Sequence, residues 1–175
     1  MDGSGAVTIE VVDALAKVDR AAWNALANPP GAPFDPFVSH EFLAALEESG
    51  CVSPAAGWTP VHLIAHGPGG VLTGAMPLYV KDHSYGEYVF DHAWADALHR
   101  AGGRYYPKLQ CAAPFTPVPG RRIFAHHHET ERALAQAAKS LAERVNASSV
   151  HVTFAEQEAC SRLGTLGYLT RVGLQ

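Results

Sequence analysis

The chain has 175 residues and a net charge of −4, with 47% hydrophobic and 17% charged residues. These values fit one globular domain, and they exclude a disordered chain and a broad basic surface for nucleic acid. The three cysteines have no disulfide or zinc spacing, and neither a secretory signal nor a membrane-spanning run is visible, so we expect a cytoplasmic protein.

The N-terminal part predicts one strand and two helices. The β-branched run 7–12 indicates a strand, and a helix follows that Asp13 would cap and the Asn-Pro-Pro-Gly stretch 28–31 would end. Ser39 then caps a second helix, which stops at Gly50.

Residues 58–66 and 71–81 predict a β-hairpin, because the connector 67–70 is rich in glycine and proline. Pro77 lies within the second arm and cannot donate a hydrogen bond to a neighbouring strand. We therefore expect an edge there, or a point where neighbouring strands part and open a cleft.

The remainder alternates helices and strands. We expect helices at 92–101, 129–146 and 156–163, and strands at 105–112, 150–155 and 168–174. This alternation predicts one α/β domain with a mixed sheet covered by helices. Because the chain stops at Gln175, inside or just beyond the last strand, we also expect a C-terminal truncation.

A concentrated positive field lies between Asp96 and Glu129, where the chain has no acidic residue. The loop 115–122 leads from this window towards the helix at 129, and helix N-termini bind anions. One interpretation is a phosphate or pyrophosphate site, and the other is a proline-stiffened surface loop with solvated arginines. The basic residues of the window are Arg100, Arg104, Lys108, Arg121 and Arg122, with His99 and His126 to His128.

A second cluster of polar groups occupies residues 81–94, where acids, imidazoles and phenols surround Gly86. Such groups serve positioning and proton transfer in a cleft, and Tyr85, Glu87 and Asp91 are the candidates for proton handling. The alternative is a polar loop whose aromatic rings pack on the sheet.

The three histidines 126–128 complete no tetrahedral ligand set, so we expect a solvated loop and no metal site. The sequence also lacks the glycine-rich and nucleophile motifs of serine hydrolases, P-loop NTPases and Rossmann enzymes.

From about Asp35 to the last residue, four blocks of the sequence resemble the FemAB-like predicted N-acyltransferases, a family of peptidoglycan biosynthesis or recognition. The blocks are Pro36-Phe37-Val38-Ser39-His40-Glu41-Phe42-Leu43, His83-Ser84-Tyr85-Gly86-Glu87-Tyr88-Val89-Phe90-Asp91, Tyr105-Tyr106-Pro107-Lys108-Leu109-Gln110 and Pro114-Phe115-Thr116-Pro117-Val118.

The resemblance implies a relative of the GNAT acyltransferases, with a mixed, splayed sheet and helices on both sides. It implies that the loop 114–122 lies where GNAT enzymes hold a pyrophosphate, and that this chain is the first of two such domains. The Arg/Gln-x-x-Gly-x-Gly/Ala signature of GNAT enzymes is absent. An acyl-CoA donor and an aminoacyl-tRNA donor, the latter engaged by the full-length protein, therefore both stay open.

These observations predict an N-acyltransferase that transfers an acyl or aminoacyl group to an amine, with a peptidoglycan precursor as a possible acceptor. The alternatives are a non-catalytic domain that recognises a phosphorylated cell-wall precursor through Arg121 and Lys108, and a fragment without independent activity. The oligomeric state is left open. The residues expected to bind an anion or substrate are Lys108, Gln110, Phe115, Thr116, Gly120 and Arg121.

Overall fold

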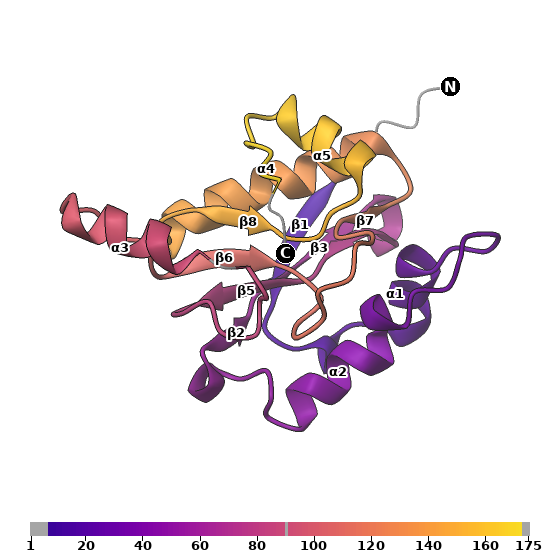
Figure 1. The fold of residues 1–175 in the computed structure, drawn as a ribbon. Coiled ribbons are helices and arrows are strands. Elements are labelled where there is room, and N and C mark those ends of the chain that lie inside the picture. The colour runs from indigo at the N-terminus through magenta and orange to yellow at the C-terminus, as the bar shows by residue number, and fades with distance from the viewer. Residues whose placement is uncertain (1–6, 90, 173–175) are drawn as a thin grey trace.

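The computed structural model describes residues 7–89 and 91–172 (Figure 1). The helices are α1 (Arg20–Ala27), α2 (His40–Glu48), α3 (His92–Arg100), α4 (His128–Arg144) and α5 (Gln157–Gly164). The strands are β1 (Thr8–Val12), β2 (Trp58–Pro60), β3 (His62–His66), β4 (Leu72–Met76), β5 (Leu78–Lys81), β6 (Lys108–Cys111), β7 (Phe124–Ala125) and β8 (Val150–Val152). Short 3-10 turns lie at Leu15–Lys17, Pro36–Val38, Pro54–Ala56 and Pro68–Gly70.

A long hairpin forms the centre of the fold and confirms the prediction for 58–81. Each arm consists of two strands, β2 with β3 and β4 with β5, which are interrupted at Val61 and Pro77. The antiparallel register places Trp58 opposite Lys81 and Leu63 opposite Met76.

The strands part at Pro77, as the missing amide of this proline predicts. On the outer side of the second arm, β4 pairs with β7 whereas β5 pairs with β6. The resulting sheets have the orders β1-β3-β4-β7 and β2-β5-β6-β8, and β8 runs parallel to β6. Residues 112–123 connect β6 to β7, the two strands that pair with the second arm, and lie where the two sheets diverge.

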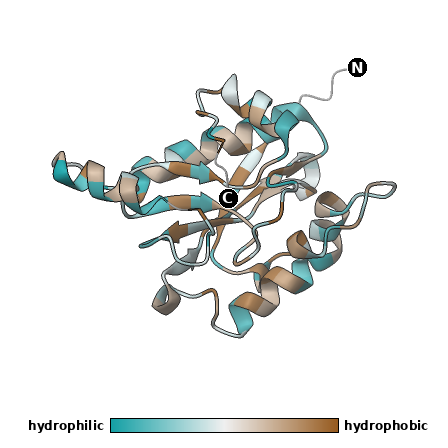
Figure 2. Cartoon of the chain, in the orientation of Figure 1, coloured by the Kyte–Doolittle hydropathy of each residue, from teal (hydrophilic) through white to brown (hydrophobic). Residues whose placement is uncertain are grey.

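Helices cover both faces of this splayed sheet (Figure 1). Helices α1 and α2 enclose a core that includes Trp23, Leu43 and Phe124. On the opposite face, α4 packs Leu134 and Ala138 against residues of β3, β4, β5 and β6. Figure 2 shows brown, hydrophobic segments along the central strands and teal, hydrophilic segments on β6 and β8. In contrast, α3 has no buried residue and projects from the body of the domain.

Side-chain caps mark the starts of α1 and α2. Ser39 accepts a hydrogen bond from the Phe42 amide at 3.3 Å and caps α2, as expected. The prediction for Asp13 is wrong, because Asp19 caps α1 by accepting from the Ala22 amide at 2.8 Å. Asp13 instead forms an exposed ion pair with Lys17.

The C-terminal half contains the three expected helices, α3, α4 and α5, and shorter versions of two expected strands, β6 and β8. The strand expected at 168–174 does not form over 168–172, and 173–175 lie outside the described residues. There, the Tyr168 hydroxyl donates to the Ala135 carbonyl at 2.7 Å and fixes the segment on α4. Strand β7 was not expected from the sequence.

Candidate functional site

The two faces of the sheet β2-β5-β6-β8 differ in polarity because side chains alternate along each strand. Leu109 and Cys111 of β6 face α4 and join its apolar core. Lys108 and Gln110 therefore point to the opposite face, where their strand partners are Lys81 and Tyr79. Across the parallel pair, His151 lies opposite Gln110. We call this surface, formed by Tyr79, Lys81, Lys108, Gln110 and His151, the polar face.

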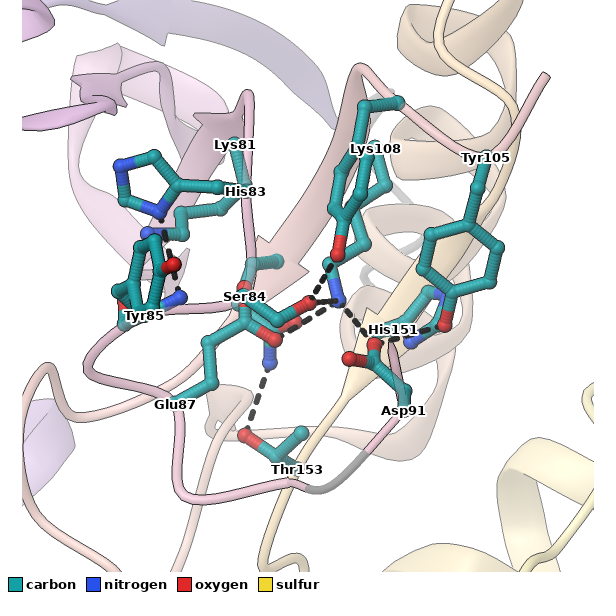
Figure 3. A network of polar contacts seen from close by, with 12 residues as sticks. Lys81, His83, Ser84, Tyr85, Glu87, Asp91, Tyr105, Lys108, His151 and Thr153 are labelled. Atoms are coloured by element: carbon teal, nitrogen blue, oxygen red, sulfur yellow. Dashed lines mark hydrogen bonds and ion pairs between the residues drawn. The ribbon is translucent and has the colours of Figure 1, made fainter. Parts of the chain in front are cut away.

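Lys108 is fully buried at the centre of the polar face. Its ammonium donates to Ser84 Oγ at 2.9 Å, Glu87 Oε2 at 2.8 Å and Asp91 Oδ2 at 2.7 Å (Figure 3). The three acceptors belong to the segment 82–91, which links β5 to α3 and folds back over the sheet. The pairing of β5 with β6 brings Lys108 beneath this segment.

Two tyrosines complete what we call the Lys108 cluster, which consists of Lys108, Ser84, Glu87, Asp91, Tyr105 and Tyr106. The Tyr105 hydroxyl donates to Asp91 Oδ2 at 2.7 Å, and the Tyr106 hydroxyl lies 2.7 Å from Ser84 Oγ. Both rings also lie near the ammonium, whose distances to the ring centroids are 5.2 and 5.6 Å. Cation–π attraction therefore adds to the three hydrogen bonds.

The cluster leaves part of its hydrogen-bonding capacity unused. Glu87 Oε1 and Asp91 Oδ1 are buried and have no hydrogen-bond partner in the described part of the chain. The same holds for Oε1 of the fully buried Gln110, whose amide nitrogen donates to Thr153 Oγ1 at 2.8 Å. Buried acceptors without donors are costly, so these three make the Lys108 cluster and Gln110 a candidate ligand site.

The surroundings shift the two carboxyl pKa values in opposite directions. Burial raises the pKa of Glu87 above its ordinary value, and the Lys108 ammonium offsets only part of this effect. Burial also acts on Asp91, but hydrogen bonds from Lys108 and Tyr105 outweigh it and hold the pKa below its usual range. Such a pair suits different tasks, because Glu87 can exchange a proton while Asp91 stays ionised and holds Lys108.

Two further titratable groups lie on the polar face. The Lys81 ammonium donates to the Tyr85 carbonyl at 3.1 Å and lies 3.6 Å from the centroid of the Trp58 ring, and burial lowers its pKa to about 8. Burial lowers the pKa of His151 to about 4, so its imidazole is neutral at pH 7. His151 Nε2 lies 2.8 Å from Ser149 Oγ.

The structure brings together two of the three residues predicted to handle protons. Glu87 and Asp91 both contact Lys108, whereas the Tyr85 side chain is 70% exposed and its backbone carbonyl is the atom that contacts the site. Tyr105, Tyr106 and His151 were missed by sequence reasoning. The alternation of Lys108 and Gln110 with apolar neighbours on β6 is the signal that could have drawn attention to this face.

The residues predicted to bind an anion do not gather at one place. Lys108 and Gln110 belong to the polar face, while Phe115 packs its ring 5.5 Å from Trp58. Thr116 Oγ1 donates to the Pro114 carbonyl, and the Gly120 amide donates to the Phe154 carbonyl.

Arg121 is also engaged inside the fold. Its Nη1 donates to the Leu26 carbonyl at 2.7 Å and to the Ala27 carbonyl at 3.3 Å, at the end of α1. These bonds satisfy carbonyls that a helix C-terminus leaves unpaired. The loop 114–122 also does not lead directly into α4, because β7 intervenes.

A separate cleft of about 280 Å³ lies at the start of α4, where its walls include Arg122, Arg162 and Glu131. The cations there are already paired. Arg122 donates to three backbone carbonyls, and Arg162 Nε lies 2.9 Å from Glu131 Oε2. The unpartnered buried groups of the Lys108 cluster therefore make it the stronger candidate site.

Comparison with known proteins agrees with this architecture. Residues 14–175 match the model of the FemAB-like family, which is described as acting in peptidoglycan biosynthesis or recognition. The fold is similar to a crystal structure of a Trypanosoma brucei acetyltransferase, with a TM-score of 0.52 and 13% sequence identity over 97% of each chain. This likeness confirms the expected GNAT-like class, a mixed splayed sheet flanked by helices.

No curated protein is significantly similar in sequence. Within residues 7–89 and 91–172, no helix has the length and apolar character needed to cross a membrane.

Proposed function

The chain belongs to the FemAB-like family, and from this premise we propose that it is an N-acyltransferase that transfers an acyl or aminoacyl group to an amine. The family description makes a peptidoglycan precursor the first acceptor to consider. The observation that carries the proposal is the Lys108 cluster, in which two carboxylates contact one buried ammonium and have pKa values shifted in opposite directions.

An amine must lose its proton before it can attack an acyl carbonyl. Glu87 is suited to receive that proton, because burial raises its pKa and its Oε1 has no partner among the described residues. The amine nitrogen then bonds to the carbonyl carbon, and the bond from that carbon to the donor's leaving group breaks. The second proton that the nitrogen loses departs with the leaving group.

The remaining groups of the cluster act by positioning. Asp91 stays ionised and, together with Ser84, fixes the Lys108 ammonium within 3 Å of Glu87. A positive charge held beside Glu87 opposes a still larger rise of the carboxyl pKa, so Glu87 can still ionise and accept a proton. Lys108 and Asp91 therefore set the protonation state of Glu87 rather than react themselves.

The donor is part of the proposal. The structurally similar Trypanosoma brucei protein is an acetyltransferase, which supports testing acetyl-CoA first, and aminoacyl-tRNA is the second donor to test. We further propose that the reaction takes place in the cytoplasm, and that this domain is the first of two in the full-length protein.

The proposal is tested by incubating the protein with acetyl-CoA or aminoacyl-tRNA and a UDP-linked muropeptide that carries a free amine, followed by mass spectrometry of the acceptor. We expect the acceptor to gain one acyl or aminoacyl group, and Glu87→Gln to lower the initial rate roughly 100-fold or more. Glu143→Gln, which changes an exposed carboxylate on α4, serves as the matched control and should keep the wild-type rate.

Two results would count against the proposal. Equal rates for Glu87→Gln and the wild type would remove Glu87 from the mechanism. Binding of the muropeptide without transfer from either donor would favour the alternative, a domain that only recognises the precursor.

A further inference from the structure

The Lys108 cluster already shows how this site holds a primary ammonium. Lys108 carries three N–H donors, and three side-chain oxygens receive them, one each from Ser84, Glu87 and Asp91. Each carboxylate uses one oxygen for this purpose. Its second oxygen, Glu87 Oε1 or Asp91 Oδ1, is buried and without a partner in the described chain.

Gln110 supplies a third unpartnered acceptor. It lies two residues from Lys108 on β6, so both side chains leave the strand on the same face. Its amide nitrogen is fixed on Thr153, which leaves Oε1 as the free end, and the residue is fully buried. Three buried acceptors thus have no partner in the described chain, two on the carboxylates that hold Lys108 and one on Gln110 of the same strand face.

The unpartnered oxygens of these residues can accept from a cation. Glu87 and Asp91 share direct contact with one ammonium, that of Lys108. The positive charge of Lys81 also acts on Glu87, although its own contacts are the Trp58 ring and the Tyr85 carbonyl. Each carboxylate therefore keeps one oxygen without a hydrogen-bond partner among the described residues. His151 is neutral at pH 7 because burial lowers its pKa to about 4.

We propose that Glu87 Oε1, Asp91 Oδ1 and Gln110 Oε1 bind the primary ammonium of the acceptor, so that the two carboxylates bridge it and Lys108. This inference deepens the proposed function and relies on it only for the transfer that follows binding. Gln110 becomes a residue that determines specificity. A primary ammonium brings three N–H donors to three acceptors, whereas a hydroxyl brings one and a quaternary ammonium brings none.

On this proposal, residues 82–89 have to move for the amine to enter, because the three oxygens are buried. Gly86 has a φ of +79° and packs against the Phe115 ring, and its carbonyl accepts from the Phe115 amide at 3.0 Å. A local rotation at Gly86 would break both contacts with the loop 114–122. The amides of 82–89 should therefore report binding.

The test measures amine binding in the absence of any acyl donor. The wild-type protein is titrated with 1,5-diaminopentane and with L-lysine by calorimetry, and amide chemical shifts are followed by NMR. Tetramethylammonium and 1-pentanol are the comparison ligands. We expect saturable binding of the two primary amines with shifts in 82–89, and at least tenfold weaker binding of both comparison ligands.

Variants assign the binding to the three oxygens. Glu87→Gln and Gln110→Met should each weaken 1,5-diaminopentane binding at least tenfold, since each removes an acceptor from a charged donor. Glu143→Gln and Gln136→Met change exposed residues of α4 and should bind as the wild type does. If Gln110→Met fails to fold, Gln110→Asn takes its place among the variants, because its side chain is one methylene shorter and moves the amide oxygen away from the site.

Wild-type affinity in both Glu87→Gln and the Gln110 variant would overturn the inference, as would equal binding of tetramethylammonium. These outcomes differ from a failure of the proposed function. A protein that binds amines through these oxygens but transfers from no donor would refute only the transferase. A protein that transfers normally without depending on Gln110 would refute only this inference.

Discussion

Two groups of polar side chains in this domain both contain a carboxylate in contact with a basic side chain, but they differ in how completely their atoms are paired. In the first, Glu47 Oε1 lies 2.8 Å from His62 Nε2, and Glu47 Oε2 accepts from the Leu15 amide at 2.8 Å. His62 Nδ1 accepts from the Leu78 amide, which follows Pro77 at the point where the strands part. Every polar side-chain atom of this Glu47–His62 pair has a partner.

The Lys108 cluster is different, because its two carboxylates and the neighbouring Gln110 each keep one buried oxygen without a partner among residues 7–89 and 91–172. A fully paired group stabilises the fold, whereas an unpaired one costs stability until a ligand completes it. Under the proposed function, the difference predicts a structural role for Glu47 and His62. It predicts a functional role for Glu87, Asp91 and Gln110. Four substitutions test that division, taken from the largest expected effect to the smallest.

Lys108→Met should have the largest effect on stability. It leaves Glu87 and Asp91 as two buried carboxylates without a cation, which typically costs about 3–5 kcal/mol of unfolding free energy. The variant raises both folded-state pKa values, so stability should recover as pH falls and the carboxylates are protonated. Urea unfolding at pH 7.5 and pH 5 measures this. Lys17→Met, which removes an exposed ion pair with Asp13, should change little at either pH.

Glu47→Ala should come next and should affect only the fold. It leaves the Leu15 amide and His62 Nε2 buried without an acceptor, at a cost of about 2–4 kcal/mol of unfolding free energy. For a chain of this size that corresponds to a melting temperature roughly 5–15 °C lower. The rate of acyl transfer per folded molecule should stay unchanged. A rate that fell with intact folding would give Glu47 a functional part and break the comparison.

Glu87→Gln should show the opposite pattern, with acyl transfer lost and unfolding free energy within about 1 kcal/mol of the wild type. The reason is the sign of the pKa shift. Because burial raises the folded-state pKa of Glu87, its contribution to stability is present at low pH and is lost as pH rises through that pKa. A neutral amide avoids this loss, so the stability difference should shift in favour of the variant as pH rises. Urea unfolding from pH 4 to pH 8 decides the point.

Local sequence patterns were sufficient for the elements that depend on local chemistry. The apolar spacing of 129–146 predicted α4. The missing amide of Pro77 predicted either a sheet edge or a point where strands part, and the structure shows the second. Strand β7 could not be found in this way, because Phe124 and Ala125 form a strand only through their pairing with Ala75 and Gly74. The strand expected at 168–174 does not form over 168–172 for a related reason, because the Tyr168 hydroxyl donates a hydrogen bond to α4.

The site shows the same limit. The density of polar groups in 81–94 drew attention to Glu87 and Asp91, and the structure places both in contact with Lys108. Lys108 was assigned to an anion site because no acidic residue is near it in sequence, yet its partners come from the segment that follows β5. Arg121 likewise finds its acceptors at the end of α1, far earlier in the chain. The register between neighbouring strands and the path of the chain after β5 decide which charged side chains come into contact. Local sequence composition does not.

Tyr85→Phe should have the smallest effect, and it separates the outer side of segment 82–91 from the buried side. The Tyr85 ring is 70% exposed, and its contact with the site is the backbone carbonyl that accepts from Lys81, which the substitution preserves. We expect the unfolding free energy to change by less than about 0.5 kcal/mol and the transfer rate by less than about twofold. A proton-handling role for Tyr85, which the sequence predicts, requires instead a loss of about 100-fold in the transfer rate.

Tyr105→Phe is the matched comparison, because it removes a hydroxyl that donates to Asp91 from the buried side. If Tyr85→Phe abolishes transfer while Tyr105→Phe does not, the reacting groups lie on the outer surface of the segment, and the Lys108 cluster joins Glu47 and His62 as a structural feature.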